Sequence, residues 1–483
     1  MATRRDLIAA LSQAVGNEAV IWRPEDVRAY EYDGTVETRL PHAVVLPETA
    51  EQVAAVVAAC NLLQVPITPR GAGTGLSGGA VARKRGVVIS TARMNRIIQI
   101  DPINRLAVVQ PGVANLAVSL AAASSGLFYA PDPSSQKACT IGGNVAENAG
   151  GPHCLALGVT TNHVLAMEVV TADGTLVRLG SPTPDIGPGY DLRGAFIGSE
   201  GTLGIVTEVT LRLLPLPASI VTLLAVFDTI EQASESVSAI IGAGLVPAAI
   251  EMMDRVTLQA AEAGLQCGYP PDAGAVLLVE VDGIADIVEE QAGRIRAECL
   301  EHGAMEVRIA EDDEERERLW KGRKGAIGAL GRIAPNYYIL DGVVPRSRLV
   351  ETMAVVERVS AAYNFPIANV FHAGDGNLHP CVLFDDREPG ARQRVLEAGE
   401  AIMRACIDAG GTLSGEHGIG YEKQQFMGWL YSDEDMENME RLRPVFGNEG
   451  LFNPCKILPG GTGCGEMAHD AAAIRAAGQD AYV

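Results

Sequence analysis

The chain has 483 residues, more than one simple hydrophobic core accommodates, so we expect two or three domains. Its 47% hydrophobic and 20% charged residues are the composition of an ordinary soluble globular protein. The net charge of -22 argues against nucleic acid as a partner, because phosphate recognition needs a basic surface. No uninterrupted apolar stretch of about eighteen residues occurs, so no membrane span is expected.

The cysteines and the N-terminus favour an intracellular protein. Nine cysteines are scattered along the chain without a C-x-x-C pair, which favours reduced thiols over a disulfide framework. They also lack the close spacing of iron–sulfur ligands. The first residues lead into a mixed helix without an apolar core, so no signal peptide is expected. We therefore expect a cytoplasmic protein.

Residues 1–217 predict an α+β domain. Residues 43–46 form a short apolar strand, and Thr49 caps a helix in which Gln52 completes a capping box. Residues 65–69 then lead into a glycine cluster. Further elements are a helix near 115–126 and strands at 86–91, 96–101, 105–110, 164–171, 175–179 and 203–213.

A second domain is expected over residues 218–410, after the boundary marked by Pro215 and Pro217. An acidic stretch at 311–315 opens a helix that runs into Trp320. The remaining elements predict an antiparallel sheet under helices, with strands at 220–227, 275–282, 337–345, 366–372 and 378–384 and helices at 229–243, 284–302 and 389–408. Residues 411–459 form a C-terminal segment, and 460–483 a small polar tail.

Two short motifs near the C-terminus hold three of the chain's eight histidines. Residues 371–380 place His372 and His379 on either side of a glycine-rich turn, and residues 415–420 place Glu416 and His417 between glycines. Imidazole and carboxylate ligands suit a divalent metal such as zinc, iron or manganese, and three protein ligands leave a position open for substrate. A lone histidine near a glycine turn is more often a surface or hydrogen-bonded residue, but this combination favours a catalytic metal site.

Other residues of these motifs have simpler interpretations. His417, next to the carboxylate, is placed to handle a proton. Asp375 offers a further carboxylate, although in a Gly-Asp-Gly turn it more often bonds its own backbone.

A glycine loop at residues 69–79 contains a G-x-G-x-x-G string at Gly73, Gly75 and Gly78. A Rossmann site needs a helix directly after this string, whereas here the chain runs through residues 83–86 into a strand. No G-K-[ST] follows either, so a Walker loop is excluded. The loop is therefore either a nest of backbone N–H groups for an anionic phosphate or a plain flexible turn.

Two later stretches accompany this loop, at residues 131–151 and 198–206. In this order the three motifs resemble the FAD-binding domain of the vanillyl-alcohol oxidase and p-cresol methylhydroxylase superfamily. The resemblance implies an α+β fold, in which an FAD-binding domain precedes a substrate (cap) domain with an antiparallel sheet and the C-terminal segment returns to the flavin. It implies that FAD is bound by Arg70, Gly71, Ala72, Gly73, Thr74, Gly75, Leu76, Ser77, Pro131, Asp132, Thr140, Gly143, Asn144, Asn148, Gly150, Ile205 and Asn453. The glycine loop has no histidine for covalent attachment, so non-covalent FAD is expected.

Residues 319–324 and 451–456, with the two histidine motifs, resemble the FAD-linked 2-hydroxy acid dehydrogenases over residues 40–458. This family includes D-lactate and D-2-hydroxyglutarate dehydrogenases and glycolate oxidase catalytic subunits, and the similarity is closest to the last. It implies that His372, His379 and Glu416 bind the metal. It also implies that Arg323 binds the substrate carboxylate and His417 the substrate hydroxyl, although an isolated arginine after a charged helix is usually solvated.

The resemblance implies a metal-assisted, FAD-dependent oxidation of a small 2-hydroxy acid to the 2-oxo acid. D-2-hydroxyglutarate enzymes carry a lysine and an asparagine at the positions of Ile339 and Cys381, so glycolate or D-lactate fits better than a dicarboxylate. The alternatives are a stand-alone D-lactate or D-2-hydroxyglutarate dehydrogenase and a non-catalytic FAD-binding subunit. The intact histidine motifs argue against the latter.

The chain has no cluster or haem motif of its own, so its electrons are expected to pass to a partner or a quinone rather than to NAD. We expect iron–sulfur and second FAD-domain subunits or a quinone acceptor as partners, and homo-oligomers are a further expectation. Such a partner would hold the protein peripherally at the inner face of a membrane.

Overall fold

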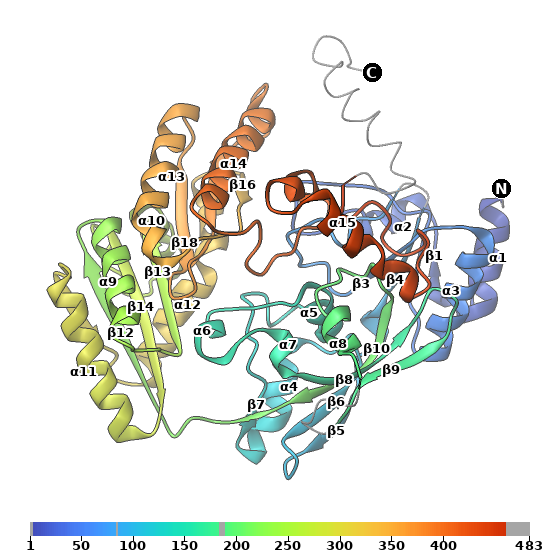
Figure 1. Ribbon diagram of the computed structural model, residues 1–483, viewed down its shortest axis with the longest axis horizontal. Coiled ribbons are helices and arrows are strands. Elements are labelled where there is room, and N and C mark those ends of the chain that lie inside the picture. Colours follow the sequence, from blue (N-terminus) through green and yellow to red (C-terminus); the bar gives the residue numbers. More distant parts are fainter. Residues whose placement is uncertain (1–2, 84–85, 183–188, 460–483) are drawn as a thin grey trace.

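The computed structural model describes residues 3–83, 86–182 and 189–459 (Figure 1). The predicted tail at 460–483 lies outside these residues. Within them, helices and largely antiparallel sheets confirm the predicted α+β class. The domain boundaries stay a prediction. None of the described helices is long and apolar enough to cross a membrane.

The N-terminal sheet carries the glycine loop. Among the described residues it has the strand order β1-β2-β4-β3, with β2, β4 and β3 parallel. These strands are β1 (Val20–Ile21), β2 (Ala43–Val45), β3 (Ile67–Arg70) and β4 (Val87–Ser90). The loop leaves the carboxyl end of β3, and its residues 71–83 form no helix, so the predicted absence of a Rossmann helix is confirmed for these residues.

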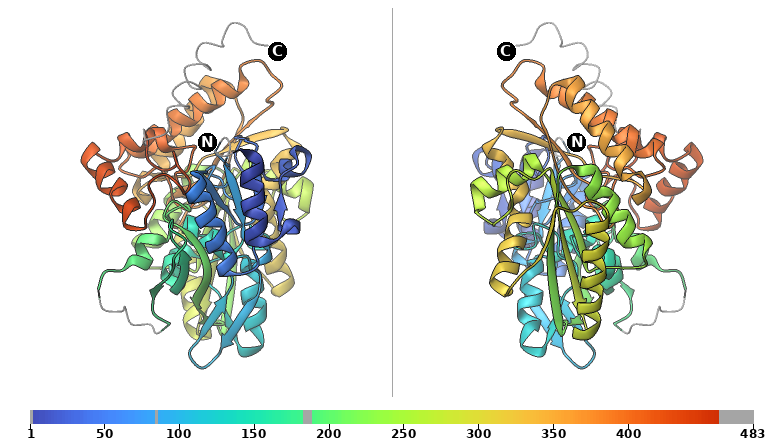
Figure 2. Two further views of the ribbon diagram at one scale, coloured as in Figure 1. Left: turned by 90° about the vertical axis from the view of Figure 1, so that its right-hand side faces the viewer. Right: turned by 90° about the vertical axis from the view of Figure 1, so that its left-hand side faces the viewer.

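Helix α3 (Ala50–Leu63) connects β2 to β3 and buries Val53, Val56 and Val57 against this sheet. Thr49 caps it as predicted, because its hydroxyl accepts a hydrogen bond from Gln52 N at 3.3 Å. The reciprocal bond of a capping box is absent from the described contacts, since the Gln52 side chain accepts from Glu48 N at 2.7 Å. Figure 2 shows α1 (Arg4–Val15) beside α3 at this end of the molecule.

A second, antiparallel sheet follows, with the order β5-β6-β10-β8-β9 in the described chain. Every strand was predicted within one or two residues, namely β5 (Ile97–Asp101), β6 (Leu106–Val109), β8 (Val164–Val170), β9 (Leu176–Gly180) and β10 (Ile205–Arg212). Helix α5 (Ile141–Glu147) packs on it and starts at Thr140, whose hydroxyl accepts from Gly143 N at 3.3 Å. This helix was not predicted, because Gly142 and Gly143 hide its pattern.

The third sheet lies between two layers of helices. Its central strands are antiparallel in the order β12-β14-β13-β18, namely β12 (Ser219–Phe227), β14 (Ala275–Gly283), β13 (Ala249–Asp254) and β18 (Ile367–His372). One face packs against α9 (Ile230–Gly242), α11 (Ala285–Glu301), α13 (Leu349–Tyr363) and α14 (Ala391–Asp408). The other packs against α10 (Arg255–Leu265) and α12 (Asp313–Ala329). The elements β13, α10 and α13 were not predicted.

Two predicted strands are each broken in the structure. The strand expected at 337–345 divides into β16 (Asn336–Ile339) and β17 (Gly342–Val343). The strand expected at 378–384 divides into β19 (Asn377–Leu378) and β20 (Pro380–Phe384). The breaks leave Asp341 and His379 outside the regular ladders, where their side chains turn toward the C-terminal segment.

The C-terminal segment runs from α14 back to the N-terminal sheet (Figure 1). Phe452 bridges Ile67 of β3, and the buried ammonium of Lys456 donates to the carbonyl oxygens of Gly79 and Val81. Of the cysteines, seven are free thiols, namely Cys60, Cys139, Cys154, Cys267, Cys299, Cys381 and Cys406. Cys455 is disulfide-bonded, whereas the seven free thiols agree with the prediction that reduced cysteines predominate.

Candidate functional site

Three predicted metal ligands meet at one point. His372 ends β18, His379 lies between β19 and β20, and Glu416 lies in the loop after α14. The Nε2 atoms of His372 and His379 lie 3.2 Å and 3.3 Å from the same oxygen, Oε1 of Glu416. One potential ligand atom from each residue lies within 4.8 Å of the others. Both histidines are buried, at 4% and 3% exposure, so these side chains are held in place.

The opposite ring nitrogens of the two histidines have acceptors. His372 Nδ1 lies 2.8 Å from Glu251 Oε1, and His379 Nδ1 lies 3.2 Å from the carbonyl oxygen of Leu340. These acceptors favour the tautomer with the proton on Nδ1, which leaves the Nε2 lone pair free for a metal. His379 Nε2 is buried and makes no hydrogen bond within the described chain. The donor set therefore fits a divalent cation.

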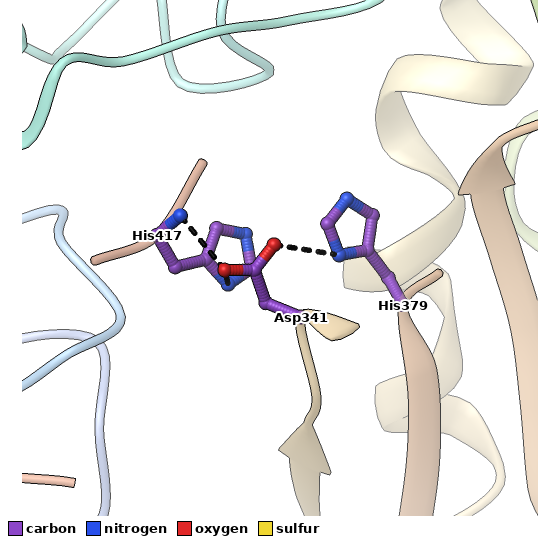
Figure 3. Close-up of side chains that lie close together, drawn as sticks. All are labelled: Asp341, His379 and His417. Carbon is purple, nitrogen blue, oxygen red and sulfur yellow. Dashed lines mark hydrogen bonds and ion pairs between the residues drawn. The ribbon is translucent and has the colours of Figure 1, made fainter. Parts of the chain in front are cut away.

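Asp341, His379 and His417 form a second cluster of potential ligands (Figure 3). The buried Asp341 carboxylate, however, is already saturated. It accepts hydrogen bonds from Ser414 Oγ at 2.6 Å, from three backbone N–H groups of residues 415–417 at 2.9 to 3.2 Å, and from Lys423 Nζ at 3.0 Å. Burial would raise the pKa of Asp341, but His417, Lys423 and His379 hold it well below its usual range. Asp341 therefore anchors the loop that carries Glu416 and His417.

His417 lies beside this cluster with its ring stacked on that of His379, at 4.8 Å between centroids and 7° between planes. Its Nε2 is 3.8 Å from Glu416 Oε1. Burial lowers the pKa of His417 to about 4. The imidazole is therefore neutral at neutral pH and has a lone pair that can accept a proton.

Arg323 reaches the same place from α12. It is 2% exposed, and its guanidinium forms an ion pair with Glu251 Oε2 on β13. Its Nε is buried and makes no hydrogen bond to the described residues. The guanidinium is therefore held by Glu251, and Arg323 is one of the residues that line the cavity described next.

One cavity joins this cluster to the glycine loop. Of the predicted residues, it is lined by Arg70, Gly71, Ala72, Gly73, Thr74, Gly75, Leu76, Thr140, Gly143, Asn144, Ile205, Arg323, His372, His379, Glu416 and His417. Gly73 has φ +74°, and a Cβ there would collide with the guanidinium of Arg70, so glycine is required at this turn. The cavity thus brings the glycine loop together with the cluster of His372, His379 and Glu416.

The other predicted cofactor residues are not among those that line the cavity, namely Ser77, Pro131, Asp132, Asn148, Gly150 and Asn453. Asn453 Nδ2 donates to the backbone oxygens of Gly79 and Glu200 and so ties the loop to its neighbours. Gly150 lies against Glu416, because a Cβ there would be 2.9 Å from Glu416 Oε2. Asp132 pairs with His153 and Lys324.

Three acidic residues of the site were not singled out from the sequence. Glu251 lies in the unpredicted strand β13. Glu147 and Glu200 lie within the glycine-rich motifs and line the cavity. Their carboxylates face the same glycine, since a Cβ on Gly418 would lie 2.6 Å from Glu147 Oε2 and 2.8 Å from Glu200 Oε1. Burial raises the pKa of Glu200 to about 7. The sequence could have pointed to Glu147 and Glu200, because both lie inside motifs that were already linked to the cofactor.

Comparison with protein families gives two consecutive matches. Residues 41–180 match the family described as "FAD binding domain". Residues 216–457 match "FAD linked oxidases, C-terminal domain". The first match includes the glycine loop, and the second includes Arg323 and the cluster of His372, His379 and Glu416.

Similar proteins agree with these families. Glycolate oxidase subunit GlcD of Escherichia coli strain K12 is 47% identical over 96% of this chain and 93% of its own length. D-lactate dehydrogenase of Anaerostipes hadrus is 35% identical over 86% of this chain and 89% of its own. The solved structure of p-cresol methylhydroxylase with substrate bound superposes with a TM-score of 0.80 at 17% identity, covering 94% of this chain and 96% of that one. The predicted p-cresol methylhydroxylase-type fold is thereby confirmed.

Proposed function

Because the chain belongs to the FAD-linked 2-hydroxy acid dehydrogenases, enzymes with an FAD-binding domain and an FAD-linked oxidase C-terminal domain, we propose that it oxidises glycolate or D-lactate to the 2-oxo acid with the help of a divalent metal. The observation that carries this proposal is the convergence of His372, His379 and Glu416 within 4.8 Å. They converge on the cavity that the glycine loop also lines.

The chain's own residues divide the work of the reaction. When bound, FAD supplies a hydride acceptor, and a divalent metal supplies Lewis acidity at the substrate hydroxyl. His372, His379 and Glu416 would hold the metal through Nε2, Nε2 and a carboxylate oxygen. The glycine loop would hold the FAD pyrophosphate through its backbone N–H groups, as a non-covalent ligand.

Arg323 and His417 would act on the substrate itself. Arg323 lines the cavity, and its guanidinium would bind the substrate carboxylate and so fix which Cα–H faces the flavin. The neutral His417 imidazole would accept the hydroxyl proton.

Ile339 and Cys381 support a small monocarboxylate. The two residues pair directly across β16 and β20, and Cys381 is fully buried. Both pack into the apolar cluster that includes Trp320, so neither supplies a polar group to the cavity. A second substrate carboxylate would find no partner at these positions.

An external electron acceptor is the remaining part of the proposal. In the described chain no cysteine belongs to a group of potential metal ligands. These residues therefore offer no thiolate ligand set for a second redox centre that could take electrons from the flavin. One relative is named as a subunit of glycolate oxidase. We propose an iron–sulfur or second FAD-domain subunit, or a quinone, as the acceptor. Such a partner would bring the protein to the inner face of a membrane.

Turnover with different acceptors tests this proposal. The purified protein is expected to oxidise glycolate or D-lactate rapidly with an artificial electron-accepting dye, and slowly with oxygen or cytochrome. The measurement is the initial rate with each acceptor at the same acid concentration. Equal rates with dye and oxygen would remove the basis for a partner, and no rate with any acceptor would contradict the proposed oxidation.

A further inference from the structure

Glu251 is a buried carboxylate placed between two parts of the site. It lies on β13, where its register partner on the neighbouring strand β18 is His372. Side chains directly opposite each other on adjacent strands share one face of the sheet. This face packs against α12, the helix that carries Arg323. The topology therefore brings three distant parts of the sequence to one carboxylate.

The contacts of Glu251 use both of its oxygens. His372 Nδ1 lies 2.8 Å from Oε1 and 3.0 Å from Oε2, and Oε2 also forms the ion pair with Arg323. Glu251 itself has no exposed surface. A buried carboxylate is strongly unfavourable unless it is paired and hydrogen-bonded, so the three side chains stabilise one another in a single arrangement.

We propose that Glu251 is a positioning residue that holds His372 and Arg323 at a fixed spacing matched to 2-hydroxy acids. This inference rests on the proposed function. In such a substrate the carboxylate and the hydroxyl are on adjacent carbon atoms, so the groups that bind them must lie close together. Glu251 contacts both the Arg323 guanidinium, which would bind the substrate carboxylate, and the His372 imidazole. The metal held by His372 would bind the substrate hydroxyl.

Glu251 also sets the chemical state of both partners. By accepting from His372 Nδ1, it keeps the Nε2 lone pair directed at Glu416 and the metal position, as carboxylate–histidine pairs do in other metal sites. By pairing with Arg323, it holds in place the guanidinium of a residue that lines the cavity. Its loss is therefore expected to weaken metal binding and substrate binding together.

The test uses FAD-loaded protein stripped of metal and titrated with Zn²⁺ against a chromogenic chelator. Glu251→Gln keeps the shape of the side chain but loses its charge. It is expected to lower Zn²⁺ affinity about 10- to 100-fold, as is typical for the loss of an outer partner of a metal-binding histidine. The KM for glycolate or D-lactate is expected to rise in the same variant.

Two comparison variants separate positioning from general stability. Arg323→Lys keeps a cation beside Glu251 and leaves the contact between Glu251 and His372 in place, so we expect a higher KM with near wild-type Zn²⁺ affinity. Glu280→Gln removes another buried carboxylate, on β14, whose partners are His153, Trp320 and Thr222. It is expected to lower the melting temperature and leave Zn²⁺ affinity unchanged.

The outcomes distinguish this inference from the proposed function. Wild-type Zn²⁺ affinity in FAD-loaded Glu251→Gln would overturn the positioning role while the metal site stands. A wild-type protein that binds no divalent metal would overturn the metal site and the positioning role together. If Glu251→Gln does not retain FAD, the titration is repeated with Glu251→Asp. This variant keeps the negative charge but has a side chain that is shorter by one methylene group. Weaker Zn²⁺ binding in that variant supports the proposal, and unchanged binding contradicts it.

Discussion

Substitution of His379 by alanine is expected to abolish turnover while FAD remains bound. The variant removes one of three nitrogen and oxygen ligands that converge within 4.8 Å, so the metal should no longer be held. Lewis-acid assistance is worth several kcal/mol, and its loss corresponds to a decrease in kcat on the order of 10³-fold or more. The measurements are kcat with a dye acceptor, metal content by elemental analysis, and flavin absorbance after desalting.

A matched control for this variant is His302→Ala. His302 caps the C-terminus of α11 and bonds the backbone oxygen of Glu298, and it does not line the cavity. It is expected to keep wild-type kcat, metal and FAD. An active His379→Ala protein would remove the metal from the mechanism. Loss of FAD from it would show that the substitution acts through folding instead.

Arg323→Ala is expected to lose about 2–5 kcal/mol of transition-state binding, the typical effect of truncating one partner of a buried charge pair. The loss should appear in kcat/KM for glycolate or D-lactate. Part of it comes from Glu251, which would remain buried without its cation. Arg323→Lys tests the substrate contact more selectively, because it keeps the charge for Glu251 but removes the planar donor fork.

The control on the same helix is Arg318→Ala, because Arg318 is exposed. It should leave kcat/KM unchanged. If Arg323→Ala and Arg323→Lys both kept wild-type kcat/KM, Arg323 would not bind the substrate carboxylate. A decrease in Arg323→Ala that Arg323→Lys fully restored would show that the charge suffices without the bidentate geometry.

The predicted site residues that meet in the structure are those carried by short, dense motifs. His372 and His379 flank one turn, and Glu416 adjoins His417, so local spacing already suggested a shared role. The glycine loop was predicted in the same way, and the structure places it on the same cavity. Most strands were predicted because short apolar runs bounded by proline or glycine mark them, and the antiparallel sheet was predicted only for the second domain.

Long-range partners could not be predicted from the sequence. Glu251 and His372 are 121 residues apart, and only the pairing of β13 with β18 brings them together. Strand β13 is buried on both faces, so it lacks the alternation that identifies a strand with one solvent-facing side. Asp341 interrupts an otherwise strand-like stretch, and its role follows from donors that lie 73 to 82 residues further along the chain.

The most direct test of the central claim is an anaerobic titration of the protein's flavin absorbance. Glycolate, D-lactate, L-lactate and D-2-hydroxyglutarate are each added to the FAD-loaded protein, before and after a chelator removes the metal. We expect glycolate or D-lactate to bleach the flavin, and the chelator to abolish that bleaching. A flavin that none of these acids bleaches, or one bleached equally after complete metal removal, would contradict the metal-assisted oxidation of a 2-hydroxy acid.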